Sequence, residues 1–535
     1  MNIAELLLQQ AHERPETPAI IESHGGRDRT VTYAELEEAT ARGASLMRKN
    51  GLLTNHTVLV FLPMSIDLYI VLLALFRLGI TAMFLDPSAG RDHLERCCSI
   101  RPPQGLIASP KAHLLRLLSP AMRRIPHRFA VGSFIPGAIP WRISEDLPLE
   151  PNIISCAPDT PALITFTSGS TGLAKGVVRS HGFLLEQHRV LEKAISLVPG
   201  ETDLTTLPIF VLANLASGIT SIIPDADLRR PGFIEPAPVL RQIDRFRPTR
   251  TVASPSLLER LCDGCKNTGR RIEWFKQVFT GGAPEFPNTL KRFANVFRKA
   301  EIIAVYGSTE AEPIGMVRWS EVTETDMAKM VSGGGLLAGK PVNGTSIKII
   351  SSQWGKPLGP LSEDEFQRLC LPESETGEII VSGGHVLKSY INHIGDEETK
   401  VRVDGEVWHR TGDSGYLDLL GRLWLMGRTS ATIVDDRGTL YPFAVECAAM
   451  QYPGVHRAAL LQYKGKRVLF VEPVDSAKII PEEGLLTGLS WACIDEVLNL
   501  KQIPLDKRHN AKVDYIALQK LLTNRGLLSF FGSLT

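Results

Sequence analysis

Apolar strand segments that alternate with helical segments are the feature that most narrows the folds open to this chain. Residues 57–63 (TVLVFLP) have the composition of a fully buried strand, residues 66–79 (IDLYIVLLALFRLG) that of a helix, and residues 80–87 (ITAMFLDP) that of another strand. Strands that are apolar on both faces are typical of parallel sheets with helices on either side. We therefore predict an α/β fold of layered sheets and helices.

The alternation returns later in the chain, where polar residues follow the strands. Residues 277–286 (QVFTGGAPEF) and 301–310 (EIIAVYGSTE) each place glycines or hydroxyl side chains directly after an apolar strand. Open α/β sheets bind ligands beyond the carboxyl ends of their strands. These two segments are therefore predicted to lie at a binding site.

The length of the chain and a change in its pattern predict more than one domain. A chain of 535 residues is too long for a single hydrophobic core. From about residue 339, short strands with turn residues are typical of an antiparallel barrel or sandwich, and a strand–helix pattern restarts after Arg428. We predict a large N-terminal domain at 1–428, with a β-rich subdomain at about 339–428, and a small mobile α+β domain at 429–535.

Composition and charge limit the classes of partner. Apolar residues make up 44% of the chain, charged residues 22%, and the formal net charge is +1, so neither nucleic acid nor an anionic membrane is expected as the main partner. The N-terminus lacks the pattern of a signal peptide. The most hydrophobic stretch, residues 68–85, contains Arg77 and Gly79 and fits a buried helix and strand better than an integral membrane segment. A cytoplasmic enzyme is the expectation.

Residues 165–176 (TFTSGSTGLAKG) carry the strongest functional signal. Glycines let backbone N–H groups surround an anion, hydroxyls add hydrogen-bond donors, and Lys175 adds a positive charge. These groups suit a nucleotide polyphosphate, although their spacing is not that of a Walker A loop. The alternative is an ordinary polar surface loop, which the strand-like segment before it and the helix-like segment after it disfavour.

Five further segments follow the phosphate segment in a fixed order. They are TGGAPEFP (280–287), YGSTEAEP (306–313), TGEIIVSG (376–383), HRTGDSGYLDLLGRLWLMGR (409–428) and DKRHNAKVD (506–514). Together with the phosphate segment, this set closely resembles the adenylate-forming superfamily, which comprises acyl-CoA synthetases, peptide-synthetase adenylation domains and luciferases. The resemblance covers nearly the whole chain.

The resemblance implies a binding site for ATP. The residues expected to contact the phosphates are Thr167, Ser168, Gly169, Ser170, Thr171, Gly172 and Lys175. The residues expected around the adenine are Gly281, Gly282, Ala283 and Tyr306, of which Tyr306 would pack against the ring. Asp413 is expected to accept hydrogen bonds from the ribose hydroxyls, with Arg428 nearby.

The resemblance also implies catalytic residues. Thr309 is expected to touch the α-phosphate, Glu310 to hold Mg²⁺, and Lys512 of the small domain to reach the carboxylate and the α-phosphate, while Lys175 would offset phosphate charge. Family members swing the small domain between half-reactions. Taken singly, Asp413 would be interpreted as a turn residue, Glu310 as a surface carboxylate and Lys512 as a solvated side chain.

Some positions depart from the pattern of ordinary acyl-CoA ligases. Val211 stands where those enzymes carry His or an aromatic residue, and Ser430 stands at the hinge position where Asp or Lys is common. Two segments, residues 215–232 and 504–514, instead resemble the β-lactone synthetases of bacterial long-chain olefin biosynthesis. In that branch the substrate's own β-hydroxyl attacks the acyl-AMP.

Three functions follow as hypotheses. The first is ATP-dependent activation of a fatty or β-hydroxy fatty acid to acyl-AMP, followed by acyl transfer or closure to a β-lactone. The second is a fatty acyl-CoA or acyl-carrier-protein ligase, for which CoA, a carrier protein or pathway enzymes would be partners. The third is a relative that binds nucleotide without catalysis. The residues expected to line the acid pocket are Phe183, Phe210, Val211 and Asn214.

Overall fold

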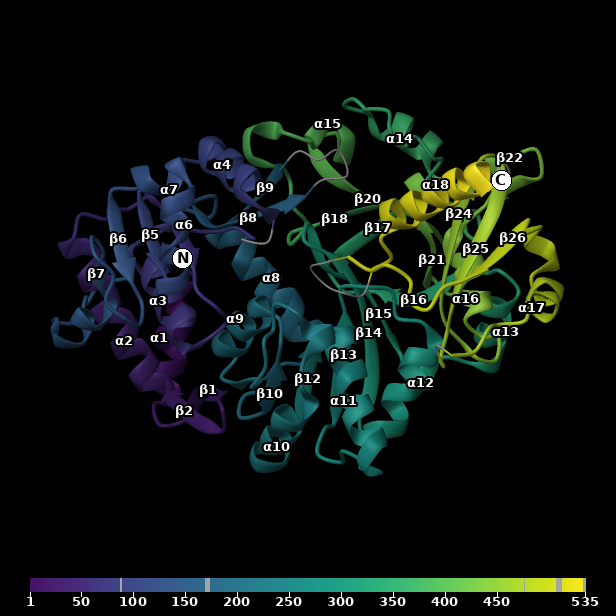
Figure 1. Cartoon of the computed structure of the whole chain (residues 1–535). Helices are drawn as coiled ribbons and strands as arrows, with labels where there is room; N and C mark the ends of the chain where they lie inside the picture. The colour runs from purple at the N-terminus through teal and green to yellow at the C-terminus, as the bar shows by residue number, and fades with distance from the viewer. Residues whose placement is uncertain (87–88, 169–173, 476, 507–511, 533–535) are drawn as a thin grey trace.

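The computed structural model describes residues 1–86, 89–168, 174–475, 477–506 and 512–532. Two large sheets, a smaller C-terminal sheet and the helices between them form the molecule (Figure 1). The layered α/β fold predicted from the sequence is confirmed.

The N-terminal sheet has the strand order β7-β6-β5-β3-β4-β8-β9. Neighbouring strands run parallel, except in the β8–β9 pair, which is antiparallel. Its strands are β3 (Thr57–Phe61), β4 (Thr81–Phe84), β5 (Gly105–Ala108), β6 (His127–Ala130), β7 (Ile139–Pro140), β8 (Pro161–Ser168) and β9 (Ala174–Ser180). Its helices are α2 (Tyr33–Lys49), α3 (Ile66–Arg77), α4 (Arg91–Ile100), α5 (Pro110–His113), α6 (Leu115–Leu118) and α7 (Pro120–Arg124). The strand–helix–strand unit predicted at residues 57–87 is thus β3-α3-β4.

Local sequence explains where these helices begin. The hydroxyl of Thr32 accepts a hydrogen bond from the backbone of Glu35, whose carboxylate accepts one in return, so a capping box starts α2. Ser65 caps α3 with its hydroxyl, which accepts a hydrogen bond from the Leu68 N–H. Every residue of β3 is buried, as expected for a strand with helices on both faces.

The second sheet has the strand order β17-β18-β20-β21-β16-β15-β14-β13-β12-β10-β11-β1-β2. It combines a mainly parallel part with an antiparallel part. Its parallel part contains β1 (Pro18–His24), β10 (Thr202–Thr205), β11 (Thr220–Ile223), β12 (Arg250–Ala253), β13 (Gln277–Gly281) and β14 (Glu301–Ser308), with β2 (Arg27–Thr32) antiparallel at the edge. The helices around this part are α1 (Ala4–Glu13), α8 (His181–Ala194), α9 (Pro208–Ala216), α10 (Pro236–Phe246), α11 (Pro255–Thr268) and α12 (Pro287–Val296).

The β-rich region continues this sheet instead of forming a separate barrel. Its elements are β15 (Ala311–Arg318), α13 (Glu324–Val331), β16 (Leu336–Pro341), β17 (Thr345–Ile350), α14 (Glu363–Leu369), β18 (Gly377–Gly383), α15 (Asp396–Thr399), β19 (Lys400–Val403), β20 (Glu406–Leu417) and β21 (Leu423–Arg428). β14, β15 and β16 pair antiparallel in succession and join the two parts. At Gly339 (φ +83°), a Cβ would lie 1.9 Å from the Met316 carbonyl oxygen, so only glycine allows this close approach.

After Arg428 the chain leaves the second sheet. The later elements are β22 (Ile433–Asp435), β23 (Gly438–Leu440), α16 (Pro442–Ala449), β24 (Val455–Tyr463), β25 (Lys466–Pro473), α17 (Glu482–Gly488), β26 (Glu496–Asn499) and α18 (Tyr515–Gly532). β24, β25 and β26 form their own sheet, and the side chains of Val445, Leu460 and Leu469 belong to its core. We call these elements the small unit; the domain boundary at residue 429 stays a prediction.

Helix α16 connects the small unit to the second sheet. Ala444 and Cys447 are buried in the core of the second sheet, whereas Val445 on the same helix packs into the core of the small unit. Among the described residues, no helix is both long and apolar enough to cross a lipid bilayer. The apolar stretch at residues 68–85 lies within α3 and β4, as predicted.

Candidate active site

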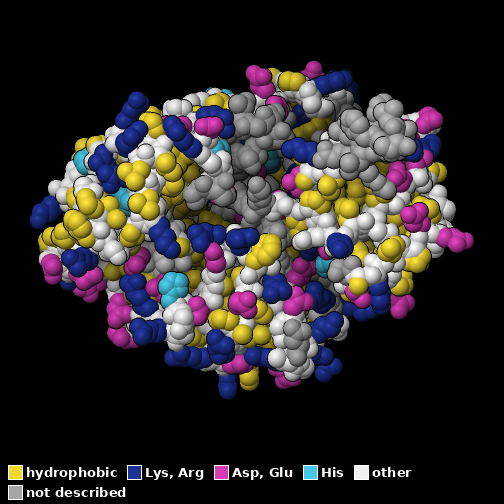
Figure 2. Space-filling view, in the orientation of Figure 1, with side chains coloured by type: hydrophobic (Ala, Val, Ile, Leu, Met, Phe, Trp, Pro, Cys, Tyr) yellow, Lys and Arg dark blue, Asp and Glu magenta, His cyan; other side chains and the backbone are white. Residues whose placement is uncertain are grey.

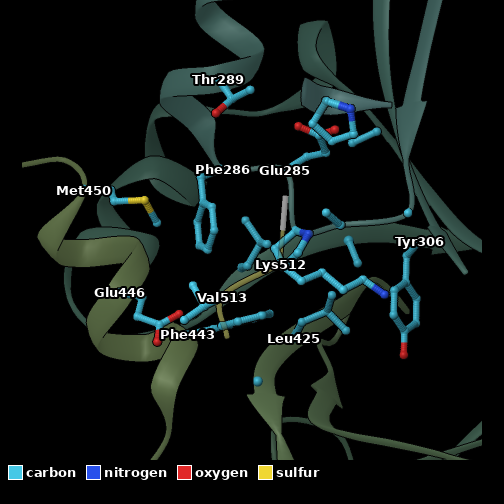
Figure 3. A pocket seen from close by; sticks show the side chains of 18 of the residues that line it. Glu285, Phe286, Thr289, Tyr306, Leu425, Phe443, Glu446, Met450, Lys512 and Val513 are labelled. Atoms are coloured by element: carbon cyan, nitrogen blue, oxygen red, sulfur yellow. The ribbon is translucent and has the colours of Figure 1, made fainter. Parts of the chain in front are cut away.

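A cavity of about 310 Å³ lies between the second sheet and the small unit. The residues that line it include Gly282, Ala283, Phe286, Tyr306, Gly307, Leu337, Asp413, Leu425, Arg428, Phe443, Glu446, Lys512, Val513 and Tyr515. Figure 3 shows Phe443 and Glu446 on one side and Tyr306 on the other, with the Lys512 side chain extending toward Tyr306. Segments more than 200 residues apart in sequence, such as those of Gly282 and Lys512, therefore meet here.

The adenine segment forms one edge of the cavity because two parallel strands end there side by side. Gly281 is the last residue of β13 and pairs with Val305 of β14. A Cβ on Gly281 would lie 2.5 Å from the Val305 carbonyl oxygen, and Gly282 has a φ of +86°. Glycine at these two positions thus lets the chain turn across the end of β14, next to Tyr306.

Tyr306, Asp413 and Arg428 form a hydrogen-bonded group on the sheet wall of the cavity. The Tyr306 hydroxyl donates to Asp413 Oδ2 at 2.8 Å, and Arg428 Nη1 lies 3.3 Å from Asp413 Oδ1. The register of β20 and β21 sets Asp413 opposite Arg428. The Asp413 carboxylate raises the pKa of Arg428, and burial raises that of Tyr306 well above its usual value. The structure therefore brings together the residues predicted for adenine and ribose.

Lys512 enters the cavity from the small unit. Its backbone N–H donates to Asp506 Oδ1 at 2.9 Å, and the Asp506 N–H donates to its carbonyl oxygen at 2.8 Å. Leu505 and Val513 pair in a single antiparallel bridge beside it. These contacts hold the backbone of Lys512 while its side chain extends into the cavity (Figure 3). The predicted role of Lys512 in adenylation stays a prediction.

Glu310 lies in a cluster of buried polar side chains next to the cavity. Its Oε1 accepts a hydrogen bond from the Tyr390 hydroxyl at 2.8 Å. Burial acts to raise the pKa of Glu310, but His409, the Tyr390 hydroxyl and Lys400 outweigh it, so the pKa is lowered. The preceding residue, Thr309, accepts a hydrogen bond at its carbonyl oxygen from Arg179 Nη2 at 2.8 Å. Glu310 is thus held as an ionised carboxylate.

Lys400 and His409 are the members of this cluster that sequence reasoning missed as functional candidates. Lys400 Nζ lies 3.2 Å from His409 Nδ1 and donates to the Leu387 carbonyl oxygen. Burial lowers the pKa of Lys400 to about 7 and that of His409 to about 3. His409 begins one of the six segments, a signal that could have identified it, whereas Lys400 stands in a segment without any motif.

The phosphate segment falls largely outside the described residues. Gly169, Ser170, Thr171 and Gly172 are not among them, and Thr167 and Ser168 are described only as the end of β8. Lys175 pairs with Thr167 in the register of β8 and β9. Its ammonium is buried, 2.9 Å from Glu398 Oε2 of α15 and above the Tyr390 ring. Its predicted contact with the phosphates stays a prediction.

The four residues predicted for the acid pocket lie on α8 and α9, and none of them lines the 310 Å³ cavity. Phe210 and Val211 are buried in hydrophobic cores, and Phe183 packs against one of them. Asn214 is fully buried, and its amide donates to Asp203 Oδ2 at 3.2 Å, Thr205 Oγ1 at 3.0 Å and Ser221 Oγ at 3.1 Å. The Asn214 amide therefore ties α9 to the sheet, a contact that sequence spacing does not reveal.

Known proteins match most of this chain. The family model of the AMP-binding enzymes matches residues 7–391. The olefin β-lactone synthetase of Stenotrophomonas maltophilia is 31% identical over 96% of this chain and 96% of its own. The enzyme of the same name from Xanthomonas campestris pv. campestris has the same identity and coverage.

A solved structure with the same architecture is the amide bond synthetase McbA from Marinactinospora thermotolerans. It superimposes with a TM-score of 0.78 and 19% identity over 97% of this chain and 99% of its own. At that identity, the likeness concerns the fold.

Proposed function

The chain belongs to the AMP-binding enzyme family, and from this premise we propose that it converts a β-hydroxylated aliphatic acid to a β-lactone through acyl-AMP. Membership makes it an ATP-dependent, adenylate-forming enzyme. The finer assignment is supported mainly by the two olefin β-lactone synthetases that match nearly the whole chain. The buried Val211, in place of a polar or aromatic side chain, is a second support.

In the first half-reaction the substrate carboxylate attacks the α-phosphorus of ATP and pyrophosphate leaves. The adenine would lie between the Gly282–Ala283 backbone and the Tyr306 ring, and the ribose hydroxyls would donate to Asp413. Two anions must approach one another, so catalysis depends on positioning and on cations placed where charge accumulates. Lys512 is the cation that extends from the small unit into the cavity. A general base is unnecessary, because the attacking carboxylate is already ionised.

Glu310 is suited to hold the Mg²⁺ that accompanies ATP in this family. An ionised carboxylate oxygen is the kind of ligand Mg²⁺ prefers, and the lowered pKa of Glu310 keeps it in that form. The ion would offset charge on the phosphates. Tyr390 orients the carboxylate through its hydrogen bond to Oε1.

In the second half-reaction the β-hydroxyl oxygen attacks the acyl-AMP carbonyl carbon. The new C–O bond closes a four-membered ring, the bond to phosphate breaks, and AMP leaves while the hydroxyl proton is released. An internal nucleophile has a large effective concentration, and the mixed anhydride supplies the driving force for the strained ring. A thiol such as CoA is the alternative acceptor and would give a thioester instead.

The test is ATP-dependent AMP release from fatty acids and β-hydroxy acids, with and without CoA, with products identified by mass. We expect repeated turnover of a β-hydroxy acid without thiol, and a product lighter than the acid by one water. Turnover that requires CoA and yields a thioester would replace the lactone assignment with an acyl-CoA ligase. Absence of pyrophosphate exchange with every acid, in protein that binds ATP, would favour a nucleotide-binding relative without catalysis.

A further inference from the structure

A group of exposed apolar side chains lies far in sequence from the active site, on the short helices α5 and α6. Leu114, Leu117 and Leu118 are 60%, 73% and 63% exposed, and Phe134 is 69% exposed. Globular proteins rarely expose several large apolar residues together without a binding role. We call these four residues the leucine patch. Figure 2 shows hydrophobic side chains gathered over the α6–α7 region, with Lys and Arg beside them.

The four residues share one surface because of how the helices are anchored. Leu114 joins α5 to α6 with helical φ and ψ, and Leu117 and Leu118 follow in α6, so their i, i+3 and i+4 spacing places them on one face. The opposite side is fixed by buried groups: His113 Nε2 lies 3.0 Å from the Phe129 carbonyl oxygen, and Met122 of α7 is fully buried. The leucines therefore cannot turn inward without displacing these contacts.

The loop that carries Phe134 packs against the same helices. A Cβ on Gly132 would lie 3.7 Å from Pro110 Cδ, at the start of α5. A Cβ on Gly137 would lie 3.6 Å from Arg116 Nη2 of α6. Phe134 lies in sequence between these two anchor points, in a loop that borders α5 and α6.

The surroundings of the leucine patch are strongly basic, although the whole chain is nearly neutral. Residues 110–142 contain no Asp or Glu, and their basic residues are Lys111, Arg116, Arg123, Arg124, Arg128 and Arg142. Among the residues that the structure describes, none of these six forms an ion pair. Glu95 of α4 is the nearby carboxylate, and it accepts hydrogen bonds from Ser119 and Ala121. In the part of the chain that the structure describes, Arg116 of α6 and Arg123 and Arg124 of α7 thus carry positive charge without an ion-paired carboxylate.

We propose that the leucine patch and its basic border bind an anionic lipid surface, with the leucines among the acyl chains and the Lys and Arg side chains at the headgroups. Apolar side chains bordered by basic ones are how peripheral proteins bind anionic bilayers. Long basic side chains place their stems along apolar surface and their charges in the polar layer. A protein partner would have to supply carboxylates around an apolar socket, and the predominance of leucine over aromatic residues fits lipid better.

The test is flotation of the full-length protein with vesicles of phosphatidylcholine containing about 30 mol% phosphatidylglycerol, compared with phosphatidylcholine alone. Two variants probe the two contributions: Leu114→Ser/Leu117→Ser/Leu118→Ser and Arg116→Gln/Arg123→Gln/Arg124→Gln. The matched control is Leu419→Ser/Leu420→Ser, because these leucines are 85% and 69% exposed in the β20–β21 turn. Circular dichroism and ATP–pyrophosphate exchange verify that all three variants fold.

We expect the wild-type protein and the control variant to float with anionic vesicles, and each patch variant to partition at least about tenfold less. High salt should release the protein, because headgroup attraction is screened. Equal flotation of patch and control variants would overturn the proposal, as would equal binding to neutral vesicles. If the wild type ignores vesicles while the patch variants lose a protein partner, the surface is a protein interface and the lipid proposal fails.

Discussion

The two walls of the cavity are held in place by different kinds of contact. On the sheet wall, Tyr306, Asp413 and Arg428 stand on strands paired with neighbours and are linked to one another by side-chain contacts. On the opposite wall, the Lys512 backbone exchanges two hydrogen bonds with Asp506, and Leu505 and Val513 form a strand bridge beside it. The sheet wall, which we propose to bind the nucleotide, is thus cross-linked by side chains, whereas the opposite wall presents the Lys512 cation.

The two walls also contact each other directly, through polar and aromatic side chains. Arg457 Nη2 of β24 lies 2.9 Å from Glu259 Oε2 of α11, and Asn288 of α12 donates to the Met450 carbonyl oxygen. Phe286 and Phe443 meet edge to face, with ring centroids 5.7 Å apart. Polar contacts of this kind exchange readily with water, whereas Ala444 and Cys447 of α16 stay buried in the core of the second sheet. We infer that the sheet wall, proposed to bind the nucleotide, is held more rigidly than the wall that carries Lys512, the proposed catalytic residue.

Replacing Lys512 should give the largest effect on the adenylation rate, because it tests the wall proposed to act in catalysis. Lys512→Ala removes the cation that the small unit brings to the reacting phosphate, so adenylation should slow by roughly 100-fold, or about 3 kcal/mol. ATP–pyrophosphate exchange measures this step. Lys501→Ala is the matched control, because Lys501 is an exposed lysine of the same unit. Exchange at the wild-type rate in Lys512→Ala would remove Lys512 from the mechanism.

Replacing Asp413 tests the recognition wall. Asp413→Ala deletes the acceptor for the ribose hydroxyls and leaves Tyr306 and Arg428 without their shared partner. We expect ATP binding to weaken roughly 30-fold, or about 2 kcal/mol, as is typical for loss of a charged acceptor. Titration calorimetry with ATP measures it, and Tyr306→Phe should cost less, since it removes one hydroxyl only. Unchanged ATP affinity in Asp413→Ala would contradict the assignment of the ribose site.

The pH dependence of stability should distinguish the walls by sign. Burial raises the pKa of Glu446 in the small unit to about 7 from its usual value of 4.5. Because the folded state holds this proton more tightly, Glu446 stabilises it fully below pH 4.5 and loses that contribution as pH rises through about 7. The lowered pKa of Lys400 in the second sheet has the opposite sign, so stability there should increase from pH 7 upward.

Thermal melts from pH 5 to pH 8 test the Glu446 contribution, which we expect to be about 2 kcal/mol. Glu446→Gln keeps the shape of the side chain but cannot ionise, so it should flatten this part of the profile. Lys400→Met would remove the opposing contribution. If the wild-type and Glu446→Gln profiles run parallel, Glu446 does not titrate in this range.

The smallest effect is expected from the ion pair between the walls. The Arg457 and Glu259 side chains are 20% and 17% exposed, so their coupling should be only about 0.5 kcal/mol, or roughly twofold in the adenylation rate. A double-mutant cycle of Arg457→Ala and Glu259→Ala measures it. The Arg437–Asp495 pair lies within the small unit and serves as the control, since its loss should not affect adenylation. Equal coupling in both cycles would show that the ion pair does not position the small unit.

Much of the fold could be predicted because its signals are local. The apolar run at residues 57–63 and the caps at Thr32 and Ser65 depend on neighbours in sequence, and the structure has β3, α2 and α3 there. The family predicted from six ordered segments is confirmed. The change in pattern near residue 339 was recognised, but the close approach of β15 to β16 at Gly339 was not, because a contact between strands leaves no pattern along the chain.

The candidate site divides in the same way. Tyr306, Asp413 and Lys512 stand in recognisable segments, and the structure brings all three to one cavity. Lys400 could not be predicted, because a lone lysine acquires a perturbed pKa only when tertiary structure buries it beside Glu310 and His409. Asn214 was named as a candidate for the acid pocket, a role that stays a prediction, and its amide hydrogen-bonds to three side chains of the sheet. Hydrogen bonds of this kind depend on strands that are distant in sequence.

Arg428 has a consequence for how force passes through the molecule. It is the last residue of β21 and is paired with Asp413, and the chain leaves the second sheet after it to reach β22 at Ile433. A rotation of the small unit would act on Arg428 and, through its ion pair, on Asp413, the residue proposed for the ribose hydroxyls. A nucleotide bound to Asp413 would resist that rotation, and its loss would free it. Single-molecule force measurements that pull the small unit away from β21 would then find a stiffer molecule when ATP is bound.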